Sequence, residues 1–520
     1  MSDRFFFIDE PMLSFGSAQE ADDPRDGLAL FGPSEQKGNL PDHVAIGTPA
    51  GLDAWSAWVD SLNRPSACLD VSRHRPWPPY PGFDVAFGAV WPSPVKTYTL
   101  DPSELARAVN KADRFERAYA VANLYLAPVD QQVPRLDGKP ALAVCIVPDA
   151  VYQNCRPKSY VAEPTDARKT TEQKRVLKAA IEDHRSGQQR LFDESEDFDD
   201  APRDLEQYGL SPDFRRQLKA RIMPHDLPVQ IVRESTLDIT PQVRDGEKGT
   251  NPLSDRLWNL GTALFYKCGR KPWKTPWARE GVCYVGLAYR RSEQDRRTAC
   301  CAAQMFLDSG DGIVFVGEFG PWYSEERKEF HLKPKAAEEL LRGTIETYQQ
   351  QDGRPLREIF LHARSGIDQE EFQGFLKACP RDARLVGIRV RKDRWGPRLF
   401  RHDNHDEPAR RGKYPVLRGT FWQRTQRHGL LFTTGFKPRI ATYDGWEVPV
   451  PLSVSVQRGE ADLVQVARDI LGLTKLNYNA CQLGESQPIT VKYSDRIGEI
   501  LLANPEVPRE CWRHNFKYYI

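Results

Sequence analysis

The order of the segments that follow Gly281 constrains the fold of this 520-residue chain more than any other feature. Three strand-like apolar segments follow one another with short connections, and they read GVCYVGLAYRR, TACCAAQMFL and GIVFVGEFG. The pattern then predicts a helix over 335–351, a strand over 357–363, a helix that begins at Asp368 and stops at Pro380, and a strand LVGIRVRK. Strands alternating with helices in this way are typical of an α/β fold.

Three hairpin-linked strands followed by helix, strand, helix and strand is the element order of an RNase H-like core. Catalytic members hold two divalent metals on carboxylates, one in the first strand and one at the end of the fourth. Here the first strand has Ala288 and no acid over 285–289, and the fourth has no acid over 360–366. We therefore expect the scaffold without its metal site. Asp368 or Asp495 could substitute from loops, although Asp368 already suits a helix cap.

The part of the chain before Gly281 has the pattern of a second α/β unit. Strands are expected at HVAIG (43–47), in the apolar run 141–152 and at LPVQIV (227–232). Helices are expected over 52–62, from a cap at Asp101, and over 253–269 with Gly269 as the stop. Residues 1–40 are rich in Gly, Pro, Asp and Phe. We expect them to lie across another domain because they have no core of their own.

The charge balance excludes one class of nucleic-acid-binding protein. Lys and Arg number 73 and Asp and Glu 72, so a net charge of +1 excludes binding through bulk positive charge. Residues 381–440 depart from this balance, with 16 basic and 5 acidic residues. There Arg389 and Arg391 alternate with apolar residues, which predicts a basic strand face that can track phosphates. A merely solvated basic face is the alternative. The HDNHD cluster (402–406) lies among turn formers and is a weak metal candidate.

Several features favour a cytoplasmic protein with no membrane partner. The ten cysteines form no C-x-x-C pair and mostly lie in apolar runs, which predicts buried free thiols. The longest aliphatic run, 141–147, is far shorter than the ~20 residues that span a bilayer. The N-terminus MSDRFFFIDEP has no secretory-signal pattern. The acidic run over 193–206 is expected to be a solvated loop, with an acidic docking patch as the alternative.

Five strings, in this order, carry a resemblance to a known family. They are DPRDGLALFGP (23–33), VYQNCRPKS (151–159), LWNLGTALFYKCGRKPW (257–273), GVCYVGLAYRR (281–291) and LTKLNYNACQLGESQPITVKYSDRIGEIL (473–501). On them the chain resembles prokaryotic Argonautes, and within these the short class built from MID and PIWI domains only. The resemblance covers nearly the whole chain. It implies an N-terminal segment (1–40) packing on the other domains, a Rossmann-like MID domain (41–275) and an RNase H-like PIWI domain (276–520).

The MID domain of that family holds the 5′-phosphate of a guide strand. Its motif is an aromatic or polar residue, a Lys one helical turn later, a Gln further on and a second Lys in a later helix. By resemblance these are Arg215, Lys219, Gln230 and Lys267, and Arg215 departs from the usual residue type. Convergent cationic and amide donors suit a terminal phosphate with up to two negative charges. Alone, Lys267 would equally fit a solvated cation at a helix C-terminus.

The chain stays aromatic and apolar over 515–520, whereas a frayed tail is more often polar. In related proteins the C-terminal carboxylate enters the phosphate pocket and helps to hold a divalent cation. The resemblance implies this role for Ile520, with Mg²⁺ shielding its carboxylate from the phosphate.

The PIWI domain departs from the catalytic pattern of the family. Catalytic members carry an Asp where this chain has Ala288 and another near 363–365. The same acids are missing in the short class, whose members do not cleave their targets. The resemblance therefore assigns no catalytic residue to this chain. The resemblance implies a protein that is not itself an enzyme. It would bind a 5′-phosphorylated guide RNA and a complementary single-stranded DNA target without cutting the target.

The resemblance also implies a partner. Short Argonautes act with a separate protein in which an APAZ domain is joined to an effector: a sirtuin-like or TIR NADase, or a nuclease. Target capture would activate this effector in antiviral and plasmid defence. Two alternatives stay open: a guide-directed endonuclease with displaced carboxylates, and a stand-alone nucleic-acid-binding module.

Overall fold

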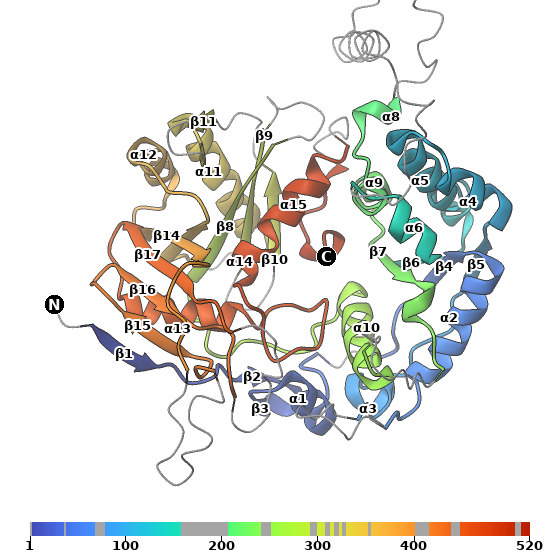
Figure 1. Ribbon diagram of the computed structural model, residues 1–520, viewed down its shortest axis with the longest axis horizontal. Coiled ribbons are helices and arrows are strands. Elements are labelled where there is room, and N and C mark those ends of the chain that lie inside the picture. Colours follow the sequence, from blue (N-terminus) through green and yellow to red (C-terminus); the bar gives the residue numbers. More distant parts are fainter. Residues whose placement is uncertain are drawn as a thin grey trace, which may run out of the picture.

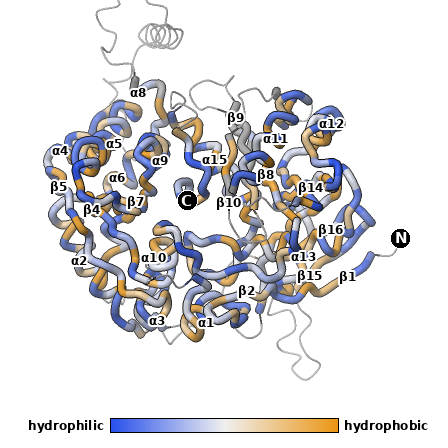
Figure 2. Tube along the Cα trace, turned by 180° about the vertical axis from the view of Figure 1, so that it is seen from behind, coloured by the Kyte–Doolittle hydropathy of each residue, from blue (hydrophilic) through white to orange (hydrophobic). Residues whose placement is uncertain are grey.

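The computed structural model of the chain consists of two lobes, each built on its own β-sheet, with the C-terminus between them (Figures 1 and 2). It describes residues 3–35, 38–67, 79–157, 206–240, 251–291, 299–306, 312–316, 322–324, 329–351, 355–400, 415–437, 448–504 and 511–520. The acidic run over 193–205 and the HDNHD cluster lie outside the described residues. Among the helices in these ranges, none has the length and apolar character of a membrane span.

Four parallel strands form the sheet of the first lobe. Their order is β5 (Lys96–Thr99), β4 (His43–Gly47), β6 (Leu142–Val147) and β7 (Val229–Arg233). Strand β4 is the first of the four in the sequence but lies between β5 and β6. The chain passes from β4 to β5 on one side and then crosses back from β5 to β6 on the other side. Open α/β sheets bind their ligands at the carboxyl edge beside such a switch in strand order. The predicted Rossmann-like fold is confirmed.

Helices cover both faces of this sheet (Figure 1). They are α2 (Pro49–Leu62), α3 (Phe83–Phe87), α4 (Pro102–Val109), α5 (Arg114–Gln131), α6 (Asp149–Asn154), α8 (Glu206–Gly209), α9 (Phe214–Ile222) and α10 (Leu253–Lys267), with the 3-10 turns η2 (Val133–Arg135), η5 (Met223–His225) and η6 (Glu234–Thr236). Ala45 and Val144 share a core with α2 and α10. Val44 and Cys145 share another with α5 and α9. Burial on both faces explains the unbroken apolar runs of β4 and β6.

Nine strands form the sheet of the second lobe. Their order is β1 (Arg4–Phe7), β15 (Thr420–Gln423), β16 (His428–Leu431), β17 (Leu452–Arg458), β14 (Arg384–Lys392), β13 (Glu358–Ala363), β8 (Val282–Arg291), β9 (Ala299–Phe306) and β10 (Gly312–Val316). Strands β8, β9 and β10 are antiparallel, β13 is parallel to β8, and β14 is parallel to β13. These five strands have the order and directions of an RNase H-like core, as predicted.

Different helices cover the two faces of the second sheet. They are α11 (Pro334–Gln351) and α12 (Gln369–Ala378) on one face, and α13 (Leu463–Leu473), α14 (Ile489–Lys492) and α15 (Ser494–Leu501) on the other. Val285 and Leu361 share a core with α11 and α12, whereas Tyr284 and Ile388 share one with α13 to α15. Helix α15 also contacts α9, so its face of the sheet adjoins the first lobe. A separate hairpin pairs β11 (Trp322–Ser324) with β12 (Glu329–His331).

The N-terminal segment spans both lobes. Its elements are β1, β2 (Leu13–Ser14), η1 (Gly16–Ala18), β3 (Glu20–Ala21) and α1 (Pro24–Phe31). Strand β1 extends the nine-stranded sheet by pairing with β15. Arg25 of α1 donates to the Asp255 carboxylate on α10 and to the Cys481 carbonyl, the latter at 2.8 Å. The segment therefore lies across other domains, as its composition predicts.

A buried ion cluster fixes this segment to the second lobe. Glu10 accepts a hydrogen bond from Arg418 at 2.8 Å and forms an ion pair with Lys475 at 2.8 Å, and Lys437 lies 2.8 Å from Asp22. Burial alone would raise the pKa of Glu10, but Arg418, Lys475 and Lys437 together lower it to about 2. The carboxylate is therefore ionised at neutral pH and stabilises the contact.

Most predicted elements are present, with shifts at their ends. Helix α2 begins at Pro49 rather than 52 because Thr48 caps the Gly51 N–H. The stop after α10 is confirmed by Gly269, whose φ is +82°. One prediction is wrong: the apolar run 141–152 is not a single strand, because Pro148 ends β6 and α6 follows. The predicted buried free thiols are confirmed at Cys145, Cys155, Cys268, Cys283 and Cys481.

Candidate nucleic-acid interface

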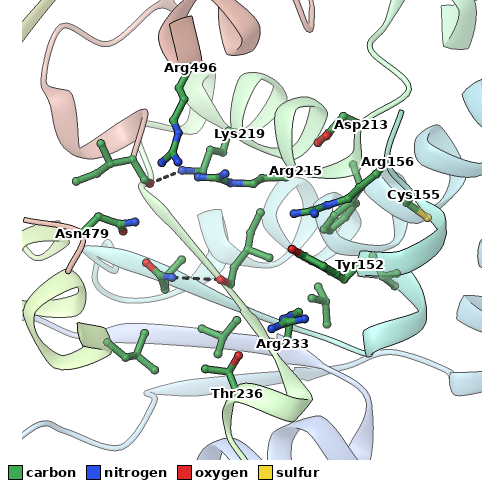
Figure 3. A pocket seen from close by; sticks show the side chains of 18 of the residues that line it. Tyr152, Cys155, Arg156, Asp213, Arg215, Lys219, Arg233, Thr236, Asn479 and Arg496 are labelled. Atoms are coloured by element: carbon green, nitrogen blue, oxygen red, sulfur yellow. Dashed lines mark hydrogen bonds between the residues drawn. The ribbon is translucent and has the colours of Figure 1, made fainter. Parts of the chain in front are cut away.

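A cavity of about 310 Å³ lies at the carboxyl edge of β6 and β7 (Figure 3). This is the edge at which the switch in strand order favours a ligand site. Its walls come from β6, β7, α6, α9 and α10 of the first lobe, from α15 of the second lobe, and from the C-terminal residue. All five residues that the resemblance assigned to the phosphate site line this one cavity: Arg215, Lys219, Gln230, Lys267 and Ile520.

Helix α9 presents two of the cations. Asp213 begins the helix by accepting a hydrogen bond from the Arg216 N–H at 3.0 Å. Arg215 and Lys219 are four residues apart, so they lie one turn apart on the same helix face (Figure 3). The Lys219 ammonium donates to the C-terminal carboxylate of Ile520 and, at 3.3 Å, to the Tyr519 carbonyl. The C-terminus is thereby held inside the cavity.

Strand β7 and the end of α10 contribute Gln230 and Lys267. Lys267 is only 1% exposed, and its Nζ donates to the Val229 carbonyl at 2.8 Å. The Gln230 amide nitrogen donates to the Ile231 carbonyl at 3.1 Å, whereas its Oε1 is buried with no hydrogen-bond partner among the described residues. A buried unpaired acceptor costs free energy that a bound ligand can relieve. This oxygen therefore indicates a place for a hydrogen-bond donor or a metal ion.

Burial and the charges of neighbouring cations lower the pKa values of both lysines in the cavity. Burial, followed by the charges of Lys267, Arg215 and Arg496, holds the pKa of Lys219 well below 10.5. Burial and then the charge of Arg215 lower the pKa of Lys267 to about 7. Both shifts disfavour the charged lysines in the absence of an anion. A bound anion would reverse them, so the cavity is built to gain from one.

Sequence reasoning missed three further arginines in the lining, namely Arg156, Arg233 and Arg496. The guanidinium carbons of Arg156 and Arg233 lie 3.4 and 4.3 Å from the ring centroid of Tyr152. Arg496 enters from α15 of the second lobe, and Figure 3 shows it close to Arg215 and Lys219. A sequence signal was present, since Tyr152, Arg156 and Arg496 lie within two of the strings that carry the family resemblance.

The charge of the lining selects the kind of ligand. Six cationic side chains line the cavity, against one acidic side chain, Asp213, and the Ile520 carboxylate. Asp213 is engaged as the cap of α9. The remaining excess of positive charge suits a compact anion with more than one negative charge, such as a terminal phosphate.

Arg389 and Arg391 are not among the cavity residues. The alternation predicted on β14 is confirmed, because Arg391 is exposed while its apolar neighbours are fully buried: Val386, Ile388 and Val390. Arg389 is partly buried and donates to the Glu329 carboxylate and, at 3.1 Å, to the Arg364 carbonyl. By the alternation of β14, both arginines lie on the sheet face that α11 and α12 cover, opposite α15.

The RNase H-like core has no acids at the positions of the metal ligands. Strand β8 carries Ala288, and β13 ends at Ala363. His362 is buried, with Nδ1 2.9 Å from the Thr490 hydroxyl, and burial lowers its pKa to about 3. Asp368 caps α12 by accepting from the Glu371 N–H at 2.8 Å, as predicted. Within the described ranges, no group of three or more His, Cys, Asp or Glu is placed to hold a metal.

Neither a protein-family model nor a curated protein matches the sequence. Solved Argonaute structures match it in fold. Clostridium butyricum Argonaute bound to a guide DNA and a 19-mer target DNA covers 97% of this chain, at 12% identity and a TM-score of 0.56. Aa-Ago with externally bound siRNA covers 99%, at 14% identity and a TM-score of 0.54. A. aeolicus Argonaute covers 96%, at 14% identity and a TM-score of 0.51.

The chain has an Argonaute fold. It spans 54%, 56% and 53% of these three chains, which is about half of their length. The Rossmann-like lobe and the RNase H-like lobe correspond to the MID and PIWI parts of the Argonaute fold. The likeness concerns the fold, so the ligand has to be inferred from the residues of this chain.

Proposed function

We propose that the chain binds the 5′-phosphate of a guide strand in the cavity between its lobes. The observation that carries this proposal is the convergence of Arg215, Lys219, Lys267 and the Ile520 carboxylate from two helices and the C-terminus. Buried lysines whose charges repel one another are costly unless an anion binds between them. The two neighbours described as bound to nucleic acid, Clostridium butyricum Argonaute and Aa-Ago, support a nucleic-acid ligand.

The cationic side chains of the cavity can each stabilise a bound phosphate. Lys219 and Lys267 supply charge in a poorly solvated place, where hydrogen bonds to ions are strong. The guanidinium of Arg215 supplies N–H donors in a planar fork that matches two phosphate oxygens. Arg496 comes from the second lobe, so a bound phosphate would also bridge the lobes.

We propose that Mg²⁺ accompanies the guide. Mg²⁺ prefers oxygen ligands and is usually bound by one or two carboxylates together with substrate phosphates and water. The Ile520 carboxylate and the unpartnered Oε1 of Gln230 fit that set, and guide phosphates would complete it. When bound, the ion would offset the repulsion between the carboxylate and the phosphate.

The guide is proposed to be RNA and its target a complementary single-stranded DNA, on the strength of the family resemblance. Base pairing would then supply sequence specificity while the protein contacts the backbones. Arg389 and Arg391 are proposed backbone contacts. The absence of acids at Ala288 and over 360–366 supports a protein that holds its target without cutting it.

The test uses guide-loaded protein and a labelled single-stranded DNA in Mg²⁺ or Mn²⁺. A matched target should be retained at full length, whereas a mismatched one should be released. A metal-dependent cut at one defined position that survives stringent purification would instead establish a guide-directed endonuclease. Equal retention of matched and mismatched targets would overturn guide-directed binding altogether.

We further propose that a separate APAZ-containing protein acts with this chain in the cytoplasm. It would carry a sirtuin-like or TIR NADase or a nuclease, which target capture activates in antiviral and plasmid defence. Co-expression with the neighbouring reading frame tests this. A stable complex whose NAD⁺ or nucleic-acid consumption begins on addition of matched target is expected. If no partner co-purifies, a stand-alone binding module is the better description.

A further inference from the structure

The core of the second lobe places an arginine where an RNase H-like enzyme places a metal ligand. Strands β13 and β8 are parallel, and His362 lies beside Gly286. Ala288 lies two residues further along β8, and Arg364 lies two residues beyond His362, just past the end of β13. These positions at one end of the paired strands are called the row below. This is the row in which a catalytic core would hold its first two carboxylates.

The side chain of Arg364 lies on the face of the sheet that α14 and α15 cover. Ala363 packs into the core with α11 and α12, so its strand neighbour His362 points to the opposite face, and the Arg364 side chain reaches Gln487 on that same side. There the Nδ1 of His362 lies 2.9 Å from the Thr490 hydroxyl of α14. The guanidinium of Arg364 is exposed, and its Nη2 lies 3.4 Å from Oε1 of Gln487, just before α14. The next helix on this face, α15, carries Arg496 into the phosphate cavity.

The residues on this row do not fit a metal pair. Two divalent ions need several carboxylates to compensate their charge and fix their positions. The row offers Ala288, a buried neutral His362 and the positive Arg364, which would repel a divalent cation. A nucleic-acid strand that crosses this face still brings phosphodiesters, which carry one negative charge each. With the ions absent, Arg364 is the group on the row that can compensate that charge.

We propose that Arg364 binds a phosphodiester of the target strand at the position where an active RNase H-like site would hold it with metal ions. The carboxylates and ions of an active site are thus replaced by one guanidinium, which binds without activating water. Arg suits this role because it stays charged and presents planar N–H donors to phosphate oxygens. The proposal rests on guide-directed target binding.

The test compares Arg364→Ala with Arg384→Ala in guide-loaded protein. Arg384 is a matched control because it is also an exposed arginine. It lies on the adjacent strand β14 and pairs with Glu358 at the start of β13, whereas Arg364 follows the end of β13. Arg364→Ala should weaken binding of a matched DNA target a few-fold to about tenfold, between the scale of a screened exposed contact and that of a charged hydrogen bond. It should also reduce the dependence of target affinity on salt by about one counterion. Arg364→Lys should recover part of the affinity.

Guide affinity is measured separately and should be unchanged in both variants. Target affinity and salt dependence equal to wild type in Arg364→Ala would overturn the proposal. Loss of guide binding in the wild type would instead concern the phosphate cavity, so the two failures are distinguishable. If Arg364→Ala lowers the melting temperature, Arg364→Gln replaces it, since it keeps a polar side chain near Gln487 without the charge. Wild-type target affinity in that variant would equally overturn the proposal.

Discussion

The cavity of the first lobe and the basic face of β14 both concentrate positive charge, but they hold their cations differently. In the cavity, Lys219 and Lys267 are buried beside other cations, and their pKa values are lowered. On β14, Arg389 already binds the Glu329 carboxylate, and Arg391 is exposed to solvent that screens it. A buried cluster of like charges is costly without a ligand, whereas an exposed basic strand is not. Convergence in the fold therefore indicates a binding site more strongly than charge density along the sequence.

The largest expected effect concerns the buried end of α10. Lys267→Ala should weaken binding of a 5′-phosphorylated guide by about 1.5–3 kcal/mol, because it removes a charge-assisted hydrogen bond from a poorly solvated cavity. The measurement is a binding titration with labelled guide. Lys377→Ala is the matched control, since Lys377 is an exposed lysine in the last turn of α12. Equal losses in the two variants would show that the cavity has no special part in guide binding.

A second change removes the carboxylate without altering any side chain. A few residues appended after Ile520 would move the terminal carboxylate away from Lys219 and Gln230. Affinity for a phosphorylated guide should fall, and its dependence on Mg²⁺ should disappear, because the ion loses a ligand. Titrations with and without a chelator measure both effects. Unchanged affinity and unchanged Mg²⁺ dependence would contradict the role assigned to Ile520.

The lowered pKa of Lys267 predicts a pH dependence that an exposed arginine would not show. In the guide-free protein this lysine loses its proton near pH 7, so phosphate binding above that pH requires proton uptake. Affinity for a phosphorylated guide should fall from pH 7 to 9, by up to about tenfold per pH unit. Lys267→Arg should flatten this profile, because arginine stays charged. A profile unchanged by Lys267→Arg would show that another group is responsible.

The same lysine predicts the opposite trend for the stability of the guide-free protein. Between pH 7 and 10.5 the unfolded chain binds a proton at this position and the folded chain does not. The free energy of unfolding should therefore rise with pH across this window, by up to about 1.4 kcal/mol per pH unit. Denaturant unfolding of wild type and Lys267→Met at several pH values measures the difference. A wild-type slope equal to that of Lys267→Met would contradict the assignment.

A smaller effect is expected from the basic face of β14. Arg391→Ala should weaken target binding only a few-fold and equally for all sequences, because exposed phosphate contacts are screened and carry no base readout. Preference for a phosphorylated guide should be unchanged. The check is target affinity at two salt concentrations. A loss as large as that of Lys267→Ala would mean that the exposed strand, and not only the cavity, is a principal site.

No gain of cleavage is expected from a single restored acid. Ala288→Asp leaves the end of β13 without a carboxylate and with the positive Arg364 beside the row. Two-metal hydrolysis would still have no defined ion positions. Incubation of the guide-loaded variant with matched labelled DNA and Mn²⁺ measures this. A defined product from Ala288→Asp that the wild type lacks would show that other residues complete a metal site.

Local signals in the sequence predicted much of the fold. Unbroken apolar runs predicted strands at 43–47, which is β4, and from 141 onward, where β6 lies. The capping residues Asp101 and Asp368 correctly predicted where α4 and α12 begin. The end of β6 was missed because Val151, in α6, is as buried as the strand residues before Pro148. Burial by tertiary packing therefore hid the change of element.

The cavity was predictable only in part. Lys219 and Lys267 came from a motif, whereas Arg233 lies outside the five strings, and Arg496, although it lies within one of them, has no local feature that marks it as a cavity residue. Arg496 reaches the cavity because α15 packs against α9 across the lobes. Nor did the sequence show that Arg389 is bound to Glu329, since that pair joins β14 to a separate hairpin. Contacts between distant elements are set by tertiary structure, which a single sequence pattern does not contain.

The most direct test compares two guides that differ only at the 5′ end. Wild-type protein is titrated in Mg²⁺ with the same labelled RNA carrying either a 5′-phosphate or a 5′-hydroxyl. Six cationic side chains around one cavity predict a clear preference for the phosphate. We expect at least about tenfold, the scale of one charged hydrogen bond. Equal affinity for the two guides would contradict the assignment of the cavity to a guide 5′-phosphate.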